Sequence, residues 1–105
     1  MKFTTLIPTT WNDGTTVNPA VMERLLDKMW RPYRGMTKEG YVTGYWIDED
    51  GTEFRDVCLK VFIVCDQSRL FELMKAVRRL GRRLGQRAMF IEVTGYDGVQ
   101  ILRTG

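Results

Sequence analysis

The side chains best suited to bind a ligand occur on two neighbouring β-prone segments, residues 40–48 and 52–65. Tyr45, Asp56 and Lys60 can together fix a bound molecule, because an aromatic ring stacks on flat groups while a carboxylate and an ammonium hold polar atoms. The chain contains no histidine, so the commonest general base near neutral pH is missing. We therefore expect a binding role before a catalytic one.

Asp50 and Gly51 separate the two segments and form a strong hairpin signal, because both residue types tolerate the positive φ of a tight turn. With these two at the centre of the turn, the register places Trp46 opposite Arg55. Such a pair would make a cation–π contact of mainly structural value, about 0.5 to 1 kcal/mol at an exposed site. A three-residue loop would shift this register.

The register also sorts the hairpin residues between the two faces of the predicted sheet. The face turned to the helices receives Val42, Val57, Leu59, Val61 and Ile63, and the open face receives Tyr41, Tyr45, Asp56, Cys58, Lys60 and Phe62. An open face that mixes aromatic and polar groups favours association with a second copy, since large apolar patches rarely stay exposed. The alternative is a ligand cleft or a flat binding platform on the same face.

A basic stripe is predicted on the helix that begins near residue 66. No acidic residue occurs from position 73 to 87, and spacings of three and four put the cations opposite the leucines. These cations can follow a phosphate backbone, but they also suit a helix C-terminus, and the net charge is only +3. A solvated helix face is favoured, with anion or nucleic-acid binding as the alternative. The residues are Lys75, Arg78, Arg79, Arg82, Arg83 and Arg87.

Carboxylates gather at the hairpin turn, and no calcium-loop spacing is present among them. With two cysteines and no histidine, the chain also lacks the ligands of a Cys/His zinc cage. We expect no metal and no other cofactor. The acidic turn can instead dock on the basic stripe of a second copy. Its carboxylates are Asp48, Glu49, Asp50, Glu53 and Asp56.

These segments belong to a regular succession of strands and helices. Strands are predicted over residues 2–8, 40–48, 52–65 and 88–94, with a possible short one at 99–102, and helices over 18–31 and from Asp66 or Ser68 to Gly85. The order β-α-β-β-α-β predicts an α+β, ferredoxin-like fold, in which two helices cover one face of a four-stranded antiparallel sheet.

Length and composition predict one domain over residues 1–105, because 44% hydrophobic residues suffice for one core but not for two. The longest apolar stretches fall far short of the roughly 20 residues that cross a bilayer, so no membrane association is expected and the cytoplasm is the expected location. The chain shows no P-loop, no dinucleotide-binding glycine pattern and no aromatic signature of RNA-recognition sheets.

Five short motifs occur in order: Asn12-Asp13-Gly14, Pro32-Tyr33-Arg34-Gly35-Met36-Thr37, Gly44-Tyr45-Trp46, Arg55-Asp56 and Leu84-Gly85-Gln86. Over residues 3–93 this pattern resembles a bacterial family of small domains of unknown function. The chain departs from the pattern at Leu84, where an aromatic is usual, and at Asp56, where Glu is more frequent. The resemblance implies a ferredoxin-like domain without an established activity. It points to Tyr33, Thr37, Trp46, Arg55, Asp56 and Gln86 as a shared site, with Arg55, Asp56 and Gln86 as its polar ligands.

Together these features predict a self-associating binding module, a homodimer through its open sheet face, with an unknown small-molecule or protein partner. Binding of an anion or a nucleic acid to the basic stripe is the alternative. A third hypothesis is a small histidine-independent enzyme built around Tyr45, Arg55 and Asp56.

Overall fold

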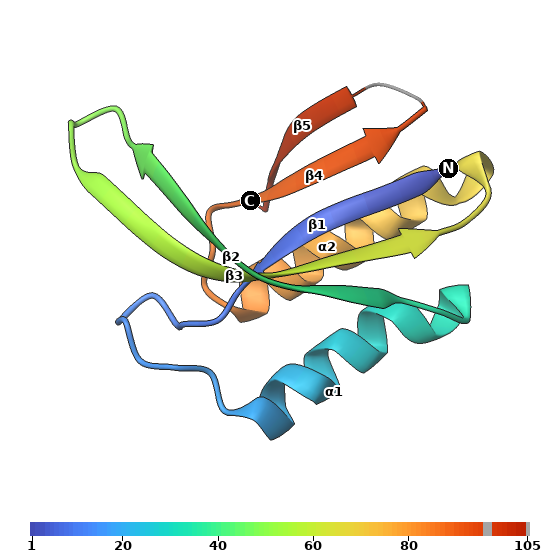
Figure 1. The fold of residues 1–105 in the computed structure, drawn as a ribbon, viewed down its shortest axis with the longest axis horizontal. Helices are drawn as coiled ribbons and strands as arrows, with labels where there is room; N and C mark the ends of the chain where they lie inside the picture. Colours follow the sequence, from blue (N-terminus) through green and yellow to red (C-terminus); the bar gives the residue numbers. More distant parts are fainter. Residues whose placement is uncertain (96–97, 105) are drawn as a thin grey trace.

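A computed structural model describes residues 1–95 and 98–104 and shows an α+β architecture (Figure 1). The strands are β1 (Lys2–Pro8), β2 (Thr37–Ile47), β3 (Glu53–Val64), β4 (Ala88–Thr94) and β5 (Gly98–Arg103). The helices are α1 (Pro19–Trp30) and α2 (Leu70–Arg83), with short 3₁₀ turns at η1 (Arg31–Tyr33) and η2 (Gln67–Arg69). All strand pairs are antiparallel, in the sheet order β2-β3-β1-β4-β5.

Local capping signals explain where the helices begin and end. The Asn18 side chain accepts a hydrogen bond from the Ala20 amide, and Pro19 occupies the first helical position of α1. The Asp66 side chain caps η2 in the same way, and this turn leads directly into α2. Gly85, with φ +73°, follows α2 in a conformation that favours glycine. These predicted boundaries are confirmed to within a few residues.

One face of the sheet packs against both helices and forms the core. Phe3 in β1 lies opposite Ile63 in β3 and Val93 in β4, and all three are almost fully buried. They belong to one apolar cluster with the helix residues Leu26, Met29, Leu73, Val77 and Leu80. Thr5 is buried among them and donates its hydroxyl hydrogen to the Phe90 carbonyl, so its polar atom has a partner.

The β2–β3 hairpin has a different register from the predicted one. Ile47 pairs with Glu53, and the Asp48 amide donates a hydrogen bond to the Thr52 carbonyl, so residues 49–51 form a three-residue loop. This loop length shifts the register by one residue. Gly51 takes the positive φ in this loop, at +85°. Trp46 therefore lies opposite Phe54, and the predicted pairing of Trp46 with Arg55 is wrong.

The one-residue shift turns every side chain of β2 to the other face, because side chains alternate along a strand. Val42 lies opposite Cys58 on the open face, and Tyr41 lies opposite Leu59 on the helix side of the sheet. The predicted faces of these two β2 residues, and of Tyr45, are therefore reversed. The predicted faces of Asp56, Lys60 and Phe62 in β3 agree with its pairing to β1, where Leu6 opposes Lys60.

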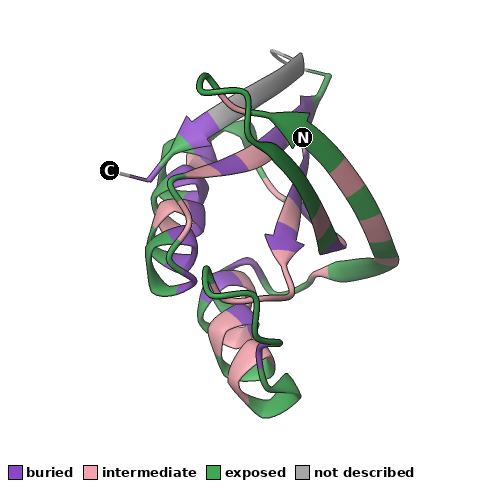
Figure 2. Ribbon diagram, turned by 90° about the vertical axis from the view of Figure 1, so that its left-hand side faces the viewer, coloured by how far each residue is buried: buried purple, intermediate pink, exposed green. Residues whose placement is uncertain are grey.

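The far ends of β2 and β3, residues 44–56, project from the rest of the molecule as a hairpin arm (Figure 1). Exposed residues predominate along this arm, in contrast to the buried sheet centre (Figure 2). Tyr45 is 75% exposed and Ile47 is 65% exposed, although they point to the helix side. Neither helix reaches far enough along the hairpin to cover them.

Candidate functional site

An ordered aromatic pair lies on the open-face side of the hairpin arm. The Trp46 and Phe54 rings stack with centroids 4.2 Å apart and an angle of 12° between their planes. The Trp46 Nε1 donates a hydrogen bond to Asp56 Oδ2 over 2.8 Å, which fixes the orientation of the indole. Half of the Trp46 surface remains exposed. The pair therefore presents a pre-oriented aromatic surface beside a carboxylate.

A row of charged groups continues from this pair along the open face. Glu39, at a register shift in β2, lies 3.8 Å from the Lys60 ammonium and 3.9 Å from that of Lys2. The Lys2 ammonium also lies over the Phe62 ring, 4.2 Å from its centroid.

Burial, together with the negative charge of Asp56, raises the pKa of the Cys58 thiol to about 11. Cys58 is therefore a protonated, unreactive thiol at neutral pH.

The six predicted ligand residues do not form one site. Trp46, Asp56 and Lys60 share the open face, whereas Tyr45 and Arg55 oppose each other on the other side of the hairpin. The predicted common face of Tyr45 and Asp56 is therefore wrong. The enzyme hypothesis built on Tyr45, Arg55 and Asp56 loses its geometric basis, because their side chains point to different sides of a two-stranded ribbon.

Gln86 belongs to a separate cluster that joins the first loop to the end of α2. The Gln86 side-chain amide donates to Asn12 Oδ1 over 3.4 Å, and the Asn12 amide donates to the Gly85 carbonyl. Two of the five sequence motifs thus meet in space although more than 70 residues separate them. Their contacts tie two loops together, which is a structural role.

The acidic turn is held by its own hydrogen bonds. The Asp48 carboxylate accepts from the Asp50 and Thr52 amides, and Asp50 accepts from Thr52. Hydrogen bonds with Asp48 and Thr52 lower the pKa of Asp50 to about 2, with a smaller contribution from the charge of Arg87. Within residues 1–95 and 98–104, no three thiol or carboxylate groups converge on a point where a metal ion could sit.

The predicted basic stripe divides into two groups with different surroundings. Arg78 donates its Nε–H to the Arg103 carbonyl and Arg82 donates to the Thr104 carbonyl, so both side chains hold the C-terminal segment against α2. Arg82 is exposed, as predicted, whereas Arg78 is half-buried. Arg79 and Arg83 instead line a groove between α1 and α2.

A polar cluster at the other end of this groove joins η1 to α2. Tyr33 donates its hydroxyl hydrogen to Glu72 over 2.8 Å, and the Arg69 guanidinium binds the same carboxylate over 2.7 Å. Hydrogen bonds from Tyr33 and Arg69 hold the pKa of Glu72 below its usual value, while burial and Glu72 raise the pKa of Tyr33. The motif at residues 32–37 indicated Tyr33 as a candidate. Its partners Arg69 and Glu72 lie 36 and 39 positions away, and no sequence motif indicated them.

Comparison with known proteins gives a likeness of fold only. No protein-family model and no curated protein matches the chain. The fold resembles that of a phage SAM lyase. That structure, solved in complex with S-methyl-5′-thioadenosine, superposes with a TM-score of 0.67 over 95% of this chain and 84% of the other, at 11% sequence identity. In the described part of the chain, no helix is long and apolar enough to span a bilayer.

Proposed function

We propose that this chain is a self-associating binding module in which a second copy covers the open sheet face. A small-molecule or protein ligand then binds where that face meets the hairpin arm. The ferredoxin-like classification is part of the proposal, as is a cytoplasmic location. The ferredoxin-like classification is supported by the element order and by the strand order β2-β3-β1-β4, with β5 as an added edge strand.

The observation that carries this proposal is an open face without a covering layer, on which apolar and charged side chains are mixed from the sheet to the arm. Leu6 and Phe62 lie half-buried on the open face, and Trp46, with Phe54 beside it, extends this surface along the arm. Sheet faces that mix aromatic, aliphatic and charged groups suit association, and a twofold contact over Leu6 and Phe62 would bury the sheet part of this face in both copies while the Trp46–Phe54 pair stays open at its edge. The ends of the arm then lie beside the second copy.

Self-association is tested by placing a charge on this face. Phe62→Glu should convert the dimer into a monomer in sedimentation equilibrium, because the contact would lose an apolar ring and would have to desolvate a charged carboxylate. Phe71→Glu is the matched control, since Phe71 is 78% exposed on α2 and belongs to the helix layer. A wild-type protein that remains monomeric at several hundred micromolar contradicts the proposal.

The fold likeness favours a second candidate, which concerns the ligand. A relative in fold binds S-methyl-5′-thioadenosine, and the Trp46–Phe54 pair beside Asp56 suits a flat purine ring with hydrogen-bond donors. We therefore propose adenosyl compounds of this type, including S-adenosylmethionine, as ligands of the same site. Lyase activity on S-adenosylmethionine is the corresponding catalytic proposal.

Calorimetry with S-methyl-5′-thioadenosine and with S-adenosylmethionine tests this candidate. Trp46→Leu should weaken binding at least tenfold, whereas Tyr45→Leu, on the opposite side of the arm, should leave it within about twofold. Chromatography of S-adenosylmethionine incubated with the protein tests for released S-methyl-5′-thioadenosine. No heat of binding at millimolar ligand removes the adenosyl candidate and leaves self-association standing.

A further inference from the structure

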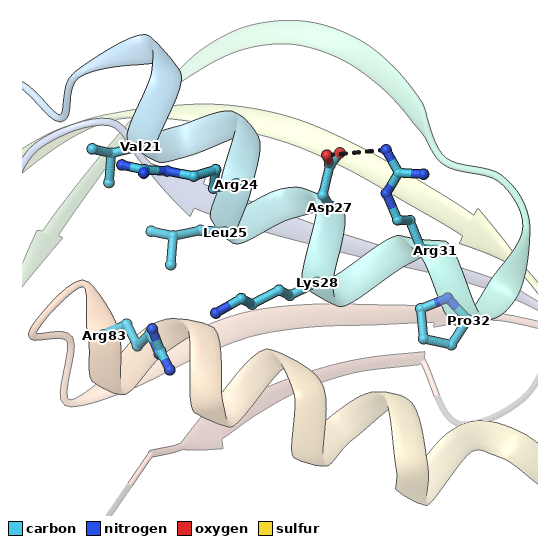
Figure 3. Close-up of a pocket in the computed structure, with 8 residues that line it drawn as sticks. All are labelled: Val21, Arg24, Leu25, Asp27, Lys28, Arg31, Pro32 and Arg83. Carbon is cyan, nitrogen blue, oxygen red and sulfur yellow. Dashed lines mark hydrogen bonds and ion pairs between the residues drawn. The ribbon is translucent and has the colours of Figure 1, made fainter.

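The helix layer carries an open groove between α1 and α2, remote from the open sheet face (Figure 3). Its volume of about 680 Å³ is in the range of small-molecule sites. Val21, Leu25 and Pro32 supply apolar surface along it. The cations that line it come from α1, η1 and α2 and are Arg24, Lys28, Arg31, Arg79 and Arg83.

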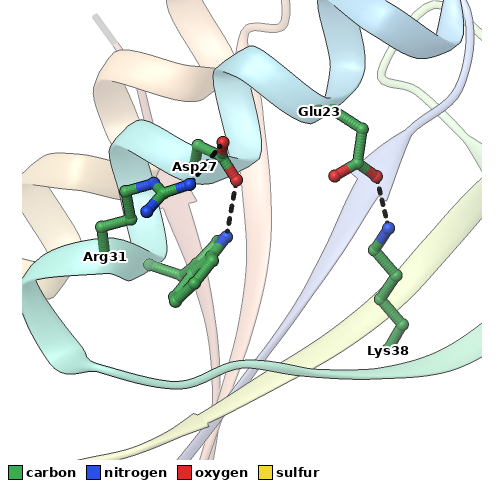
Figure 4. A network of polar contacts seen from close by, with 5 residues as sticks. Glu23, Asp27, Arg31 and Lys38 are labelled. Carbon is green, nitrogen blue, oxygen red and sulfur yellow. Dashed lines mark hydrogen bonds and ion pairs between the residues drawn. The ribbon is translucent and has the colours of Figure 1, made fainter.

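The carboxylates in this groove are already engaged by other groups. Asp27 accepts hydrogen bonds from Arg31 and from the Trp30 indole, and Figure 4 shows Asp27 directed at Arg31. Glu72 is bound by Tyr33 and Arg69. These carboxylates are therefore not free to neutralise the remaining cations.

The remaining cations have no such partner. No carboxylate of residues 1–95 and 98–104 lies within ion-pair distance of Arg24, Lys28, Arg79 or Arg83. Figure 3 shows Lys28 on α1 and Arg83 on α2 at the two sides of the groove, with Arg24 farther along α1 beyond Leu25. Like charges that line one groove from two elements repel, so an anion placed between Lys28 and Arg83 gains attraction from both sides.

We propose that the α1–α2 groove binds a nucleotide-type ligand, with phosphate oxygens held by Lys28, Arg79 and Arg83 and the base or sugar lying on Leu25 and Val21. Guanidinium groups bind phosphate oxygens in a bidentate fashion, and the apolar surface suits the uncharged part of a nucleotide. A free nucleotide and a single-stranded nucleic acid share this chemistry. The site is independent of the open-face function proposed above.

The groove differs from the basic stripe that the sequence predicted. Arg78 and Arg82 donate their Nε–H groups to carbonyl groups of the C-terminal segment, and neither lines the groove. Arg79 donates its Nε–H to the Lys75 carbonyl within α2 and does line the groove. Arg24 and Lys28 lie on α1, about 50 residues before their α2 partners, and only packing of the two helices brings them together.

The test uses fluorescence anisotropy of a labelled 12-nucleotide oligothymidylate over a salt series. Lys28→Glu combined with Arg83→Glu should weaken binding at least tenfold and lower the log–log salt slope by about 1.4, at roughly 0.7 for each lost contact with a single strand. Lys75→Glu combined with Arg87→Glu changes the net charge equally outside the groove, and should cost less than threefold. Circular dichroism confirms that both double variants fold.

Competition then identifies the source of the phosphate. Displacement of the oligonucleotide by ATP, at concentrations where inorganic tripolyphosphate has no effect, assigns the groove to free nucleotides. Oligonucleotide binding that ATP does not displace assigns it to single strands. Equal losses in the two double variants, or no binding of either ligand at low salt, overturn the proposal. Phe62→Glu should leave this binding unchanged, which separates its outcome from that of the open-face function.

Discussion

The strand β3 passes through two environments that differ in what covers its side chains. In its second half, Val61 and Ile63 are almost fully buried between β1, β2 and the helices. In its first half, Phe54 and Val57 are about 40% exposed, although the strand has the same alternation and the same partner β2. The second half pairs with β1 as well as β2, whereas the first half pairs with β2 alone and lacks a covering layer.

The difference teaches that this sequence carries more apolar surface than its own two helices cover. The helices end where the hairpin arm begins, and the arm retains exposed aromatic residues on both of its sides. Apolar side chains in the core stabilise the monomer, whereas those on the arm contribute only when another molecule covers them. Matched substitutions in the two regions should therefore have unequal effects on the monomer.

The largest difference is expected for one substitution made in both regions. Phe3→Ala should lower the free energy of unfolding by about 3 to 5 kcal/mol, because a fully buried ring would leave a cavity in the core. Phe54→Ala should lower it by less than about 1 kcal/mol in the monomer, since the ring contacts mainly Trp46. Urea denaturation at a concentration too low for self-association measures both. Equal losses would show that the arm is part of the core.

A smaller difference in stability is expected for two glycine-to-alanine substitutions, which add a methyl group instead of removing a ring. Alanine normally stabilises a helix interior relative to glycine, but a Cβ at Gly81 would lie 2.7 Å from Met89 Cγ and 2.7 Å from Thr104 Cγ2. Gly81→Ala should therefore destabilise the fold by about 1 to 3 kcal/mol through overpacking. At Gly44, on the arm, a Cβ would meet no atom within 4 Å, and Gly44→Ala should change stability by less than about 0.5 kcal/mol. Thermal unfolding compares the two, and a stabilised Gly81→Ala variant would contradict the packing seen here.

The smallest effect depends on pH. Because the folded-state pKa of Glu72 lies below its usual value of 4.5, its ionised form stabilises the fold above that pH and the contribution disappears as the pH falls. The stability gap between wild type and Glu72→Gln should therefore be fully open at pH 7 and should close in acid, as the pH falls below 4.5 and through the lowered pKa of Glu72. Glu53→Gln makes the same change on the exposed arm and should stay within about 0.5 kcal/mol throughout. A gap at Glu72 that widens in acid would contradict the cause given for its pKa.

Several parts of the fold followed from local sequence signals. The Asn18-Pro19 start of α1, the Asp66 cap and Gly85 after α2 depend on interactions within a few residues, so the sequence alone indicated them. A strand over residues 88–94 was likewise predicted, and Met89, Ile91 and Val93 form the buried side of β4. The open-face positions of Lys60 and Asp56 were also predicted, because β3 contains no irregularity that would reverse its alternation.

The candidate sites were less accessible to sequence reasoning. The hairpin loop has three residues, one more than the two-residue turn predicted from Asp50-Gly51. This one extra residue exchanged the faces of Tyr45 and Trp46. A turn signal identifies a hairpin but does not fix its loop length. The β2 residues predicted to bind a ligand were therefore assigned to the wrong side of the sheet, while the sides of the predicted β3 residues were assigned correctly.

By itself, the amino-acid sequence determined the order of strands and helices, their caps and the apolar alternation. Each of these features depends on residues only a few positions apart in the sequence. Only the tertiary structure decided the register of the hairpin, the division of the basic stripe between C-terminal carbonyls and the α1–α2 groove, and the joining of Asn12 to Gln86. These features depend on which distant segments come into contact. That choice is made by burial of the whole core rather than by any local pattern.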